Sequence, residues 1–105
     1  MAVQPITDKN FMQETNHGVT ITDFWATWCG PCRMQSPVLE VLSEKMDKVH
    51  FTKVDVDENP AVAEALDIRA IPTLLVKKDG QVVNRITGYT PLHELETILN
   101  QYVEG

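Results

Sequence analysis

Hydrophobic residues along this chain recur at two spacings, one typical of buried strands and one typical of amphipathic helices. Residues 19–25 are rich in β-branched and aromatic side chains, and their apolar positions fall on both faces of an extended chain. This pattern predicts a central strand covered on both sides, in which Asp23 is the exception. Shorter runs predict further strands at residues 3–6, 50–56, 73–76 and 81–86.

Helix start and stop signals lie between these strands. Thr7 or Asp8 can cap a first helix that runs to about residue 16, where Gly18 follows as a stop. Asn59 and Pro60 open another helix, with Asn59 as the expected cap and Pro60 at the first helical position. A last helix opens at the Thr-Pro of residues 90 and 91. Its apolar face comprises Leu92, Leu95, Ile98, Leu99 and Tyr102.

The longest helix is expected from Pro31 onward, and Pro37 should kink it. The apolar residues at helical spacing in this stretch are Val38, Leu39, Val41, Leu42 and Met46. Asp79 and Gly80 tolerate the positive φ of a tight turn, so they predict a hairpin between the last two strands. The resulting order, β-α-β-α-β-α-β-β-α, predicts an α/β three-layer sandwich. Its mixed central sheet of about five strands should be flanked by about four helices.

Length and composition fit one domain over residues 1–105, with 43% hydrophobic and 23% charged residues and no linker-like stretch. No run approaches the roughly twenty apolar residues of a membrane span, and the N-terminus lacks the basic-then-apolar pattern of a signal peptide. A cytoplasmic protein is therefore expected. The formal charge of −6 comes from scattered acids, which argues against a nucleic-acid surface.

The two cysteines of the chain, Cys29 and Cys32, are separated by two residues. A disulfide between them closes a very small loop, so loop-closure entropy predicts little stabilisation, and the pattern favours reactive chemistry. They lie where a predicted strand passes into a helix, and a helix N-terminus favours the thiolate form of Cys29. Cys32 lies further into the helix and should be more enclosed, which suits a thiol that resolves a mixed disulfide.

The segment DFWATWCGPC at residues 23–32 is similar to the active-site stretch of the thioredoxin family. The similarity continues through Pro37, DVDENP at residues 55–60, IPTL at residues 71–74, the Asp-Gly of residues 79 and 80, and Gly88, and so covers essentially the whole chain. It implies the thioredoxin fold and a general protein-disulfide reductase, in which Cys29 attacks and Cys32 resolves. Pro31 stands where oxidising relatives usually have His, which favours a reductant because an imidazole that would stabilise the thiolate is missing.

The resemblance also implies partners. A thioredoxin reductase would restore the dithiol, and the substrates would be disulfide-containing proteins such as ribonucleotide reductase, peroxiredoxins and methionine sulfoxide reductases. No cofactor is implied beyond the redox-active Cys29–Cys32 disulfide, because NADPH would be used only by the partner reductase. No metal site is expected, since the three histidines have no spacing that builds a zinc site with one C-x-x-C pair. The size of the chain favours a monomer.

Asp23 stands in a strand where a carboxylate is costly unless it is paired or protonated, so burial should raise its pKa. The resemblance implies that this acid helps to move the proton off Cys32, with Lys53 on the neighbouring strand as its charge partner. In the alternative, Asp23 bonds to local backbone and Lys53 reaches out to water.

The resemblance further implies a cis peptide bond before Pro72, beside the dithiol, which leaves the backbone of Ile71 free to pair with an extended substrate segment. The implied docking surface consists of Trp28, Gly30, Pro31, Ile71, Pro72 and Gly88. Simpler roles stay open for two of these residues: Gly88 could serve only a turn, and Trp28 could only cover the end of the helix.

Some residues depart from the pattern expected of the family, and none of them is expected to touch the sulfur chemistry. They are Thr22, Gln35, Ser36, Lys77, Thr87 and Tyr89. Two other functions stay open: a thioredoxin-fold binding or accessory subunit, and a disulfide oxidase or isomerase. The presence of both cysteines disfavours the first, and Pro31 with the missing signal peptide disfavours the second.

Overall fold

A computed structural model describes residues 3–103 of the chain, and its helices and strands follow the predicted order. They are β1 (Val3–Pro5), α1 (Phe11–Glu14), β2 (Val19–Trp25), α2 (Gly30–Lys45), β3 (Val49–Asp55), α3 (Pro60–Ala65), β4 (Thr73–Lys78), β5 (Gln81–Thr87) and α4 (Leu92–Val103). The bounds of β2 agree with the sequence prediction at both ends. The largest difference is in α1, which is much shorter than predicted.

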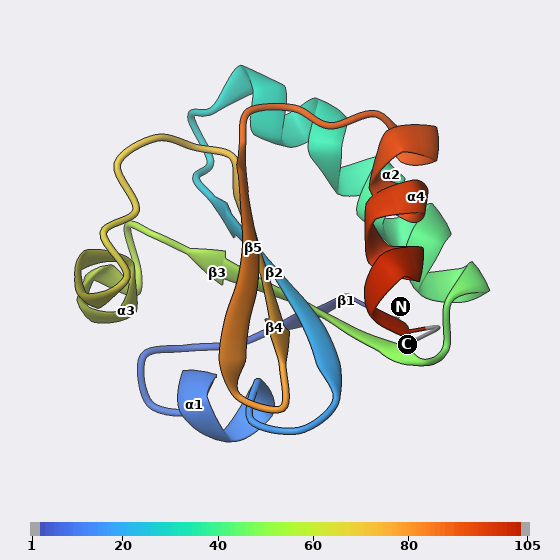
Figure 1. Cartoon of the computed structure of the whole chain (residues 1–105). Coiled ribbons are helices and arrows are strands. Elements are labelled where there is room, and N and C mark those ends of the chain that lie inside the picture. The colour runs from blue at the N-terminus through green and yellow to red at the C-terminus, as the bar shows by residue number, and fades with distance from the viewer. Residues whose placement is uncertain (1–2, 104–105) are drawn as a thin grey trace.

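The five strands form one mixed sheet in the order β1-β3-β2-β4-β5. β3 pairs in parallel with β1 and β2, whereas β4 pairs antiparallel with β2 and β5. Figure 1 shows α2 and α4 on one face of this sheet and α1 and α3 on the other. The α/β three-layer sandwich with five strands and four helices is therefore confirmed.

Alternation along β2 supplies both faces of the sheet with core residues. Ile21 packs on the α2 and α4 side with Leu39 and Leu95, while Phe24 packs on the α1 and α3 side with Phe11. Burying each large apolar side chain contributes roughly 1.5–3 kcal/mol of transfer free energy. The two apolar cores hold β2 in the centre of the sheet, and its carboxyl end leads directly into the segment that carries the cysteines.

The apolar face of α2 is narrower than the sequence predicted. Val38, Leu39 and Leu42 are buried, but Val41 is 47% exposed, so it does not share the buried face with the other apolar residues at helical spacing. Val41 lies just past the edge of the face that the other three share. Pro37 lies inside the helix, as predicted.

Two predicted helix caps were wrong, because the side chains concerned serve other elements. Thr7 closes a turn instead, in which its N–H donates to Asn10 Oδ1 at 2.7 Å, and α1 begins only at Phe11. The Asp8 carboxylate accepts from the N–H of Val62 in α3 at 2.8 Å, and Asn59 accepts from the N–H of Asp8 at 3.1 Å without capping α3. The start of α3 is thus capped by a residue from a distant part of the chain.

The predicted hairpin turn between β4 and β5 is confirmed. Asp79 and Gly80 have φ angles of +50° and +85°, the left-handed conformation that a two-residue hairpin turn needs. In Figure 1 this turn lies at the opposite end of the sheet from the N-terminal end of α2.

Candidate active site

The two cysteines form a disulfide at the N-terminus of α2. Cys29 is the residue before the first helical turn, and its Sγ accepts a hydrogen bond from the backbone N–H of Cys32 at 3.2 Å. A serine or aspartate at the same position would cap a helix in this way. Unpaired N–H groups and the positive end of the helix dipole therefore favour negative charge on Cys29 Sγ once the disulfide is reduced.

Burial does not distinguish the two cysteines, which are 4% and 3% exposed. Cys32 was expected to be the more enclosed of the two, and the difference is slight. Their neighbours distinguish them instead. Cys29 Sγ meets the start of the helix, whereas Cys32 lines a cavity that leads to Asp23 on β2.

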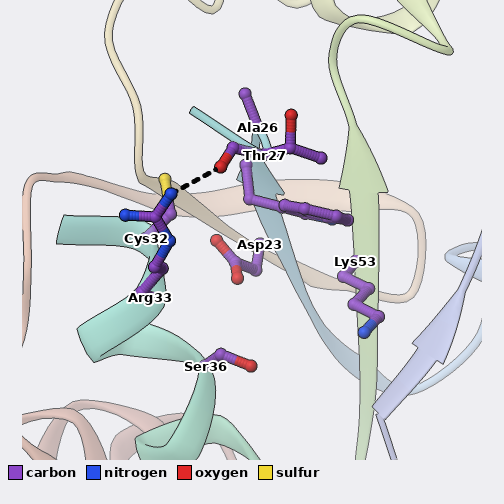
Figure 2. A pocket seen from close by; sticks show the side chains of 8 residues that line it. Asp23, Ala26, Thr27, Cys32, Arg33, Ser36 and Lys53 are labelled. Carbon is purple, nitrogen blue, oxygen red and sulfur yellow. Dashed lines mark hydrogen bonds between the residues drawn. The ribbon is translucent and has the colours of Figure 1, made fainter. Parts of the chain in front are cut away.

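This cavity has a volume of about 360 Å³ and lies between the first turns of α2 and the ends of β2 and β3. Its lining residues are Asp23, Trp25, Ala26, Thr27, Cys32, Arg33, Ser36 and Lys53. In Figure 2 the Asp23 carboxylate points toward Cys32, and Arg33 donates to the carbonyl of Thr27 at 3.0 Å. The structure thus brings together three residues that the sequence analysis singled out from three different elements: Cys32, Asp23 and Lys53.

Asp23 is 3% exposed, and its Oδ1 has no hydrogen-bond partner among residues 3–103. Burial disfavours the charged form and raises the pKa of Asp23 to about 7, while the positive charge of Lys53 acts in the opposite direction. The predicted rise in pKa is confirmed. A carboxyl group with this pKa can both accept and release a proton near neutral pH.

Lys53 lies directly across from Asp23 in the parallel register of β2 and β3. No ion pair joins the two side chains in the described part of the chain. The Lys53 ammonium group lies 5.7 Å from the centre of the Trp25 ring and, in Figure 2, points away from the carboxylate. Lys53 therefore influences Asp23 through its charge, without an ion pair. The alternative in which Asp23 bonds to local backbone does not hold for Oδ1, which has no hydrogen-bond partner among residues 3–103.

Trp28 stands beside the dithiol on the surface, with 66% of it exposed. Its indole Nε1 donates to Asp57 Oδ2 at 2.8 Å, which fixes the ring without burying it. Trp28 and Ile71 line a second, largely apolar groove of about 440 Å³, together with Val56, Ile68, Arg69 and Ala70. Gly30 and Pro31 are also exposed. Of the implied docking residues, Trp28, Gly30 and Pro31 are thus exposed next to the cysteines in the sequence.

The peptide bond between Ile71 and Pro72 is cis, as the resemblance implied. Ile71 packs against the cysteines, and its backbone makes no hydrogen bond to residues 3–103, so it is free to pair with another chain. Pro72 is buried, and its carbonyl accepts from the N–H of Gly88 at 2.8 Å. Gly88 has a φ of +95°, so the turn role that the sequence left open applies as well.

Sequence reasoning missed several residues of this region. Ser36 was expected to stay clear of the sulfur chemistry, yet it lines the cavity with Cys32. Its position four residues after Cys32 on a helix was a signal that could have placed it there. Asp57 and Arg33 received no role, and no local pattern announces the hydrogen bond between Asp57 and Trp28, which spans 29 residues.

Two further findings concern metal-binding groups and membrane-spanning helices. Within residues 3–103, no group of three or more His, Cys, Asp or Glu side chains converges in a way that could hold a metal ion. In the same range, no helix combines the length and the apolar character needed to cross a membrane.

Comparisons with known proteins agree with these features. The sequence model of the family described as Thioredoxin matches residues 2–101. A thioredoxin of Listeria monocytogenes is 53% identical over 102 residues, which are 96% of this chain and 99% of that protein. A thioredoxin of Bacillus subtilis is 47% identical over 98% of this chain and 100% of its own length. The crystal structure of thioredoxin from Malassezia sympodialis superposes with a TM-score of 0.87 at 42% identity, covering 95% of this chain and 90% of the other.

Proposed function

Because the chain belongs to the thioredoxin family, it is a thiol–disulfide oxidoreductase, and we propose that Cys29 is its nucleophile and Cys32 its resolving thiol. The observation that supports this division is the asymmetry of their surroundings. Cys29 Sγ occupies the cap position of α2, while Cys32 lines the cavity that contains Asp23. One sulfur is therefore placed to be a thiolate, and the other is placed to lose its proton during the reaction.

The first step is attack by the Cys29 thiolate on one sulfur of a substrate disulfide. A new sulfur–sulfur bond forms between Cys29 and the substrate, the substrate disulfide breaks, and the departing sulfur takes a proton from solvent. The product is a mixed disulfide that holds the substrate on the protein. Trp28, Gly30, Pro31, Ile71, Pro72 and Gly88 would contact the substrate around this bond, with the free backbone of Ile71 pairing with its extended segment.

The second step is attack by Cys32 on Cys29 Sγ. The Asp23 carboxylate accepts the Cys32 proton across the cavity, and the resulting thiolate displaces the second substrate sulfur. The displaced sulfur takes a proton from solvent, and Asp23 later releases to solvent the proton that it took from Cys32. Two electrons have then passed to the substrate, which leaves as a dithiol, and Cys29 and Cys32 are joined as a disulfide. Lys53 keeps the pKa of Asp23 lower than burial alone would set it, so that part of the Asp23 population is ionised at neutral pH.

The cycle requires a partner that returns two electrons to the disulfide. Members of the family are reduced by thioredoxin reductase and act on disulfide-containing proteins without a bound cofactor of their own. We propose the same for this chain, with NADPH consumed only by the reductase. Ribonucleotide reductase, peroxiredoxins and methionine sulfoxide reductases are the proposed substrates, and the chain is proposed to act as a monomer in the reducing cytoplasm.

The roles of the two cysteines can be tested by trapping. With the disulfide of insulin as substrate, the Cys32→Ser variant should accumulate a mixed disulfide through Cys29, which mass spectrometry detects and dithiothreitol releases. Cys29→Ser should trap nothing, because its remaining thiol, Cys32, lies inside α2 and not at the cap position, where the thiolate is favoured. A mixed disulfide through Cys32 in the Cys29→Ser variant, formed as fast as that of Cys32→Ser, would reverse the assignment.

The reduction potential separates the proposed function from the other two candidates. A value near or below about −250 mV supports a reductant, whereas a value of about −120 to −180 mV would indicate an oxidase or isomerase. A chain without a reversible two-thiol couple would be a binding subunit only. Equilibration against a dithiol buffer, followed by thiol trapping, measures this potential directly.

A further inference from the structure

Gln35 makes an unusual contact for a side chain in the middle of a helix. It lies in α2, three residues after Cys32, and is fully buried. Its Nε2 donates to the backbone carbonyl of Thr90 at 3.0 Å, and its Oε1 accepts from the backbone N–H of the same residue at 2.8 Å. The side-chain amide therefore pairs with the main chain of Thr90 as a neighbouring strand would.

The segment that Gln35 holds consists of Gly88, Tyr89 and Thr90, in the connection between β5 and α4. Thr90 is 2% exposed, and its N–H and C=O have no other partner among residues 3–103. At the other end of the segment, the N–H of Gly88 donates to the carbonyl of Pro72 at 2.8 Å. The segment is thus fastened at one end to the cis-proline loop and at the other end to the helix that carries both cysteines.

Between these two attachments, the side chain of Tyr89 is 40% exposed and takes no part in the hydrogen bonds of the described residues. It stands next to Gly88, which belongs to the proposed docking surface. A partner that reaches the dithiol therefore meets a segment whose position is set by two backbone attachments. Gln35 supplies the one that belongs to the active-site helix.

We propose that Gln35 is a positioning residue for partner recognition, which fixes the Gly88–Tyr89–Thr90 segment relative to Cys29 and Cys32 for the binding of a disulfide-containing polypeptide. This inference rests on the proposed function, because it assumes that the docking surface receives such substrates. A segment that is ordered before binding loses less conformational freedom when the partner arrives, so affinity for the partner increases. Gln35 does not line the cavity of Cys32 and Asp23, so the chemistry of the sulfurs does not depend on it.

This role predicts a separation between binding and chemistry. Gln35→Met keeps the size of the side chain but removes both hydrogen bonds to Thr90. The KM for insulin should rise roughly fivefold, because the segment loses its fixed position. The kcat, the reduction potential and the rate with a small aromatic disulfide, which needs little docking surface, should match those of the wild type.

A matched control separates this effect from a general loss of buried hydrogen bonds. Thr52→Val also removes two buried hydrogen bonds, those to Thr22 Oγ1 at 2.8 Å and to the carbonyl of Ile21 at 2.9 Å. These bonds lie within β2 and β3, away from the segment, so KM should stay within about twofold of the wild-type value. Amide hydrogen exchange at Tyr89 and Thr90 should become faster in Gln35→Met only.

Gln35→Glu provides a conservative variant whose behaviour depends on protonation. A neutral carboxyl group can both donate to and accept from Thr90, whereas a carboxylate can only accept. The ratio of the KM of Gln35→Glu to the KM of the wild type, both measured at the same pH, should therefore fall toward one as the pH is lowered. This variant also carries the test if Gln35→Met does not fold.

The outcomes decide between positioning and a merely structural role. An increase in KM alone, with faster exchange at Thr90, supports the proposal. Equal KM values for Gln35→Met and Thr52→Val, or a change in the reduction potential of Gln35→Met, would overturn it. If the wild type itself fails to reduce insulin, the proposed function fails. Unchanged hydrogen exchange at Thr90 in Gln35→Met would, independently of that result, show that Gln35 does not hold Thr90 in place.

Discussion

Two charged side chains are buried in neighbouring strands of the same sheet but on opposite faces. Asp23 in β2 faces α2 and is 3% exposed, and Lys77 in β4 faces α1 and is 4% exposed. Lys77 has found partners: its ammonium group donates to Thr15 Oγ1 at 2.9 Å and lies 5.0 Å from the centre of the Phe11 ring. Asp23 Oδ1 has no hydrogen-bond partner among the described residues.

Burial disfavours the charged form of both groups, raising the pKa of Asp23 and lowering the pKa of Lys77. A shifted pKa therefore does not by itself identify a functional residue. The difference lies in what surrounds each group: Asp23 borders a cavity that it shares with a reactive sulfur, whereas Lys77 is held by a hydroxyl and an aromatic ring. The comparison supports the catalytic role that we propose for Asp23 and indicates a structural role for Lys77.

The comparison is tested most strongly by Asp23→Asn, which preserves shape but removes the base. Turnover of insulin at pH 7 should fall by about a hundredfold, the lower end of the usual contribution of a positioned general base. The loss should appear in the release of substrate from the mixed disulfide, which rapid-quench trapping measures separately from the first attack. Unchanged release would remove Asp23 from the mechanism.

Asp23→Asn should also change how the stability of the disulfide form depends on pH. The pKa of Asp23 is about 7 in the folded chain and 3.8 when unperturbed, so between these values the folded state binds more protons than the unfolded state. The free energy of unfolding contributed by Asp23 therefore falls as the pH rises from about 4 to 7, by about 4 kcal/mol in total. Urea unfolding of both proteins across this range should show the decline in the wild type relative to the variant, and parallel curves would contradict it.

A smaller effect is expected when the electrostatic environment of Asp23 is changed without touching the carboxylate. Lys53→Met removes the charge that opposes the effect of burial, so the pKa of Asp23 should rise further. A rise of one unit from about 7 would lower the ionised fraction at pH 7 about fivefold. The pH profile of insulin reduction should therefore shift to higher pH, with activity recovered under alkaline conditions. Lys48→Met, which removes an exposed lysine outside the cavity, serves as the control and should leave the profile in place.

Much of the fold could be predicted because its signals are local. The β-branched and aromatic run of residues 19–25 predicted β2 at its observed bounds, and Asp79 with Gly80 predicted the hairpin turn through their tolerance of positive φ. The position of the cysteines at the start of a helix was also visible, since a strand pattern ends just before them and a helical one begins.

Most of the errors concern contacts between residues that are distant in the sequence. Asp8 looked like the cap of the nearest helix, but in the fold it caps α3, and a cap sequence does not say which helix it serves. The attachment of Gln35 to Thr90 spans 55 residues and was invisible for the same reason. Lys77 was noted only as a departure from the family pattern, because a lysine in a strand is normally expected to be exposed.

Lys77 provides the smallest expected effects. Lys77→Met keeps the length of the side chain and its packing against Phe11, while it removes the buried charge and the hydrogen bond to Thr15. Loss of the hydrogen bond to Thr15 destabilises the fold, whereas removal of the buried charge stabilises it. The two effects oppose each other, so the free energy of unfolding at pH 7 should change by only about 1 kcal/mol. Turnover of insulin should equal that of the wild type, and a loss comparable to that of Asp23→Asn would break the contrast between the two faces of the sheet.

The sign of the pH dependence sharpens this contrast further. Folding lowers the pKa of Lys77 from 10.5. Between the folded and the unfolded pKa, the unfolded state therefore binds more protons than the folded state. The stability of the wild type relative to Lys77→Met should therefore rise as the pH increases through that interval, opposite to the decline expected for Asp23 at lower pH. Urea unfolding of both proteins at neutral and alkaline pH measures this difference. If the difference in unfolding free energy between the wild type and Lys77→Met stayed constant with pH, Lys77 would be as well solvated in the fold as in the unfolded chain. Its pairing with Thr15 would then no longer explain why a lysine occupies this strand.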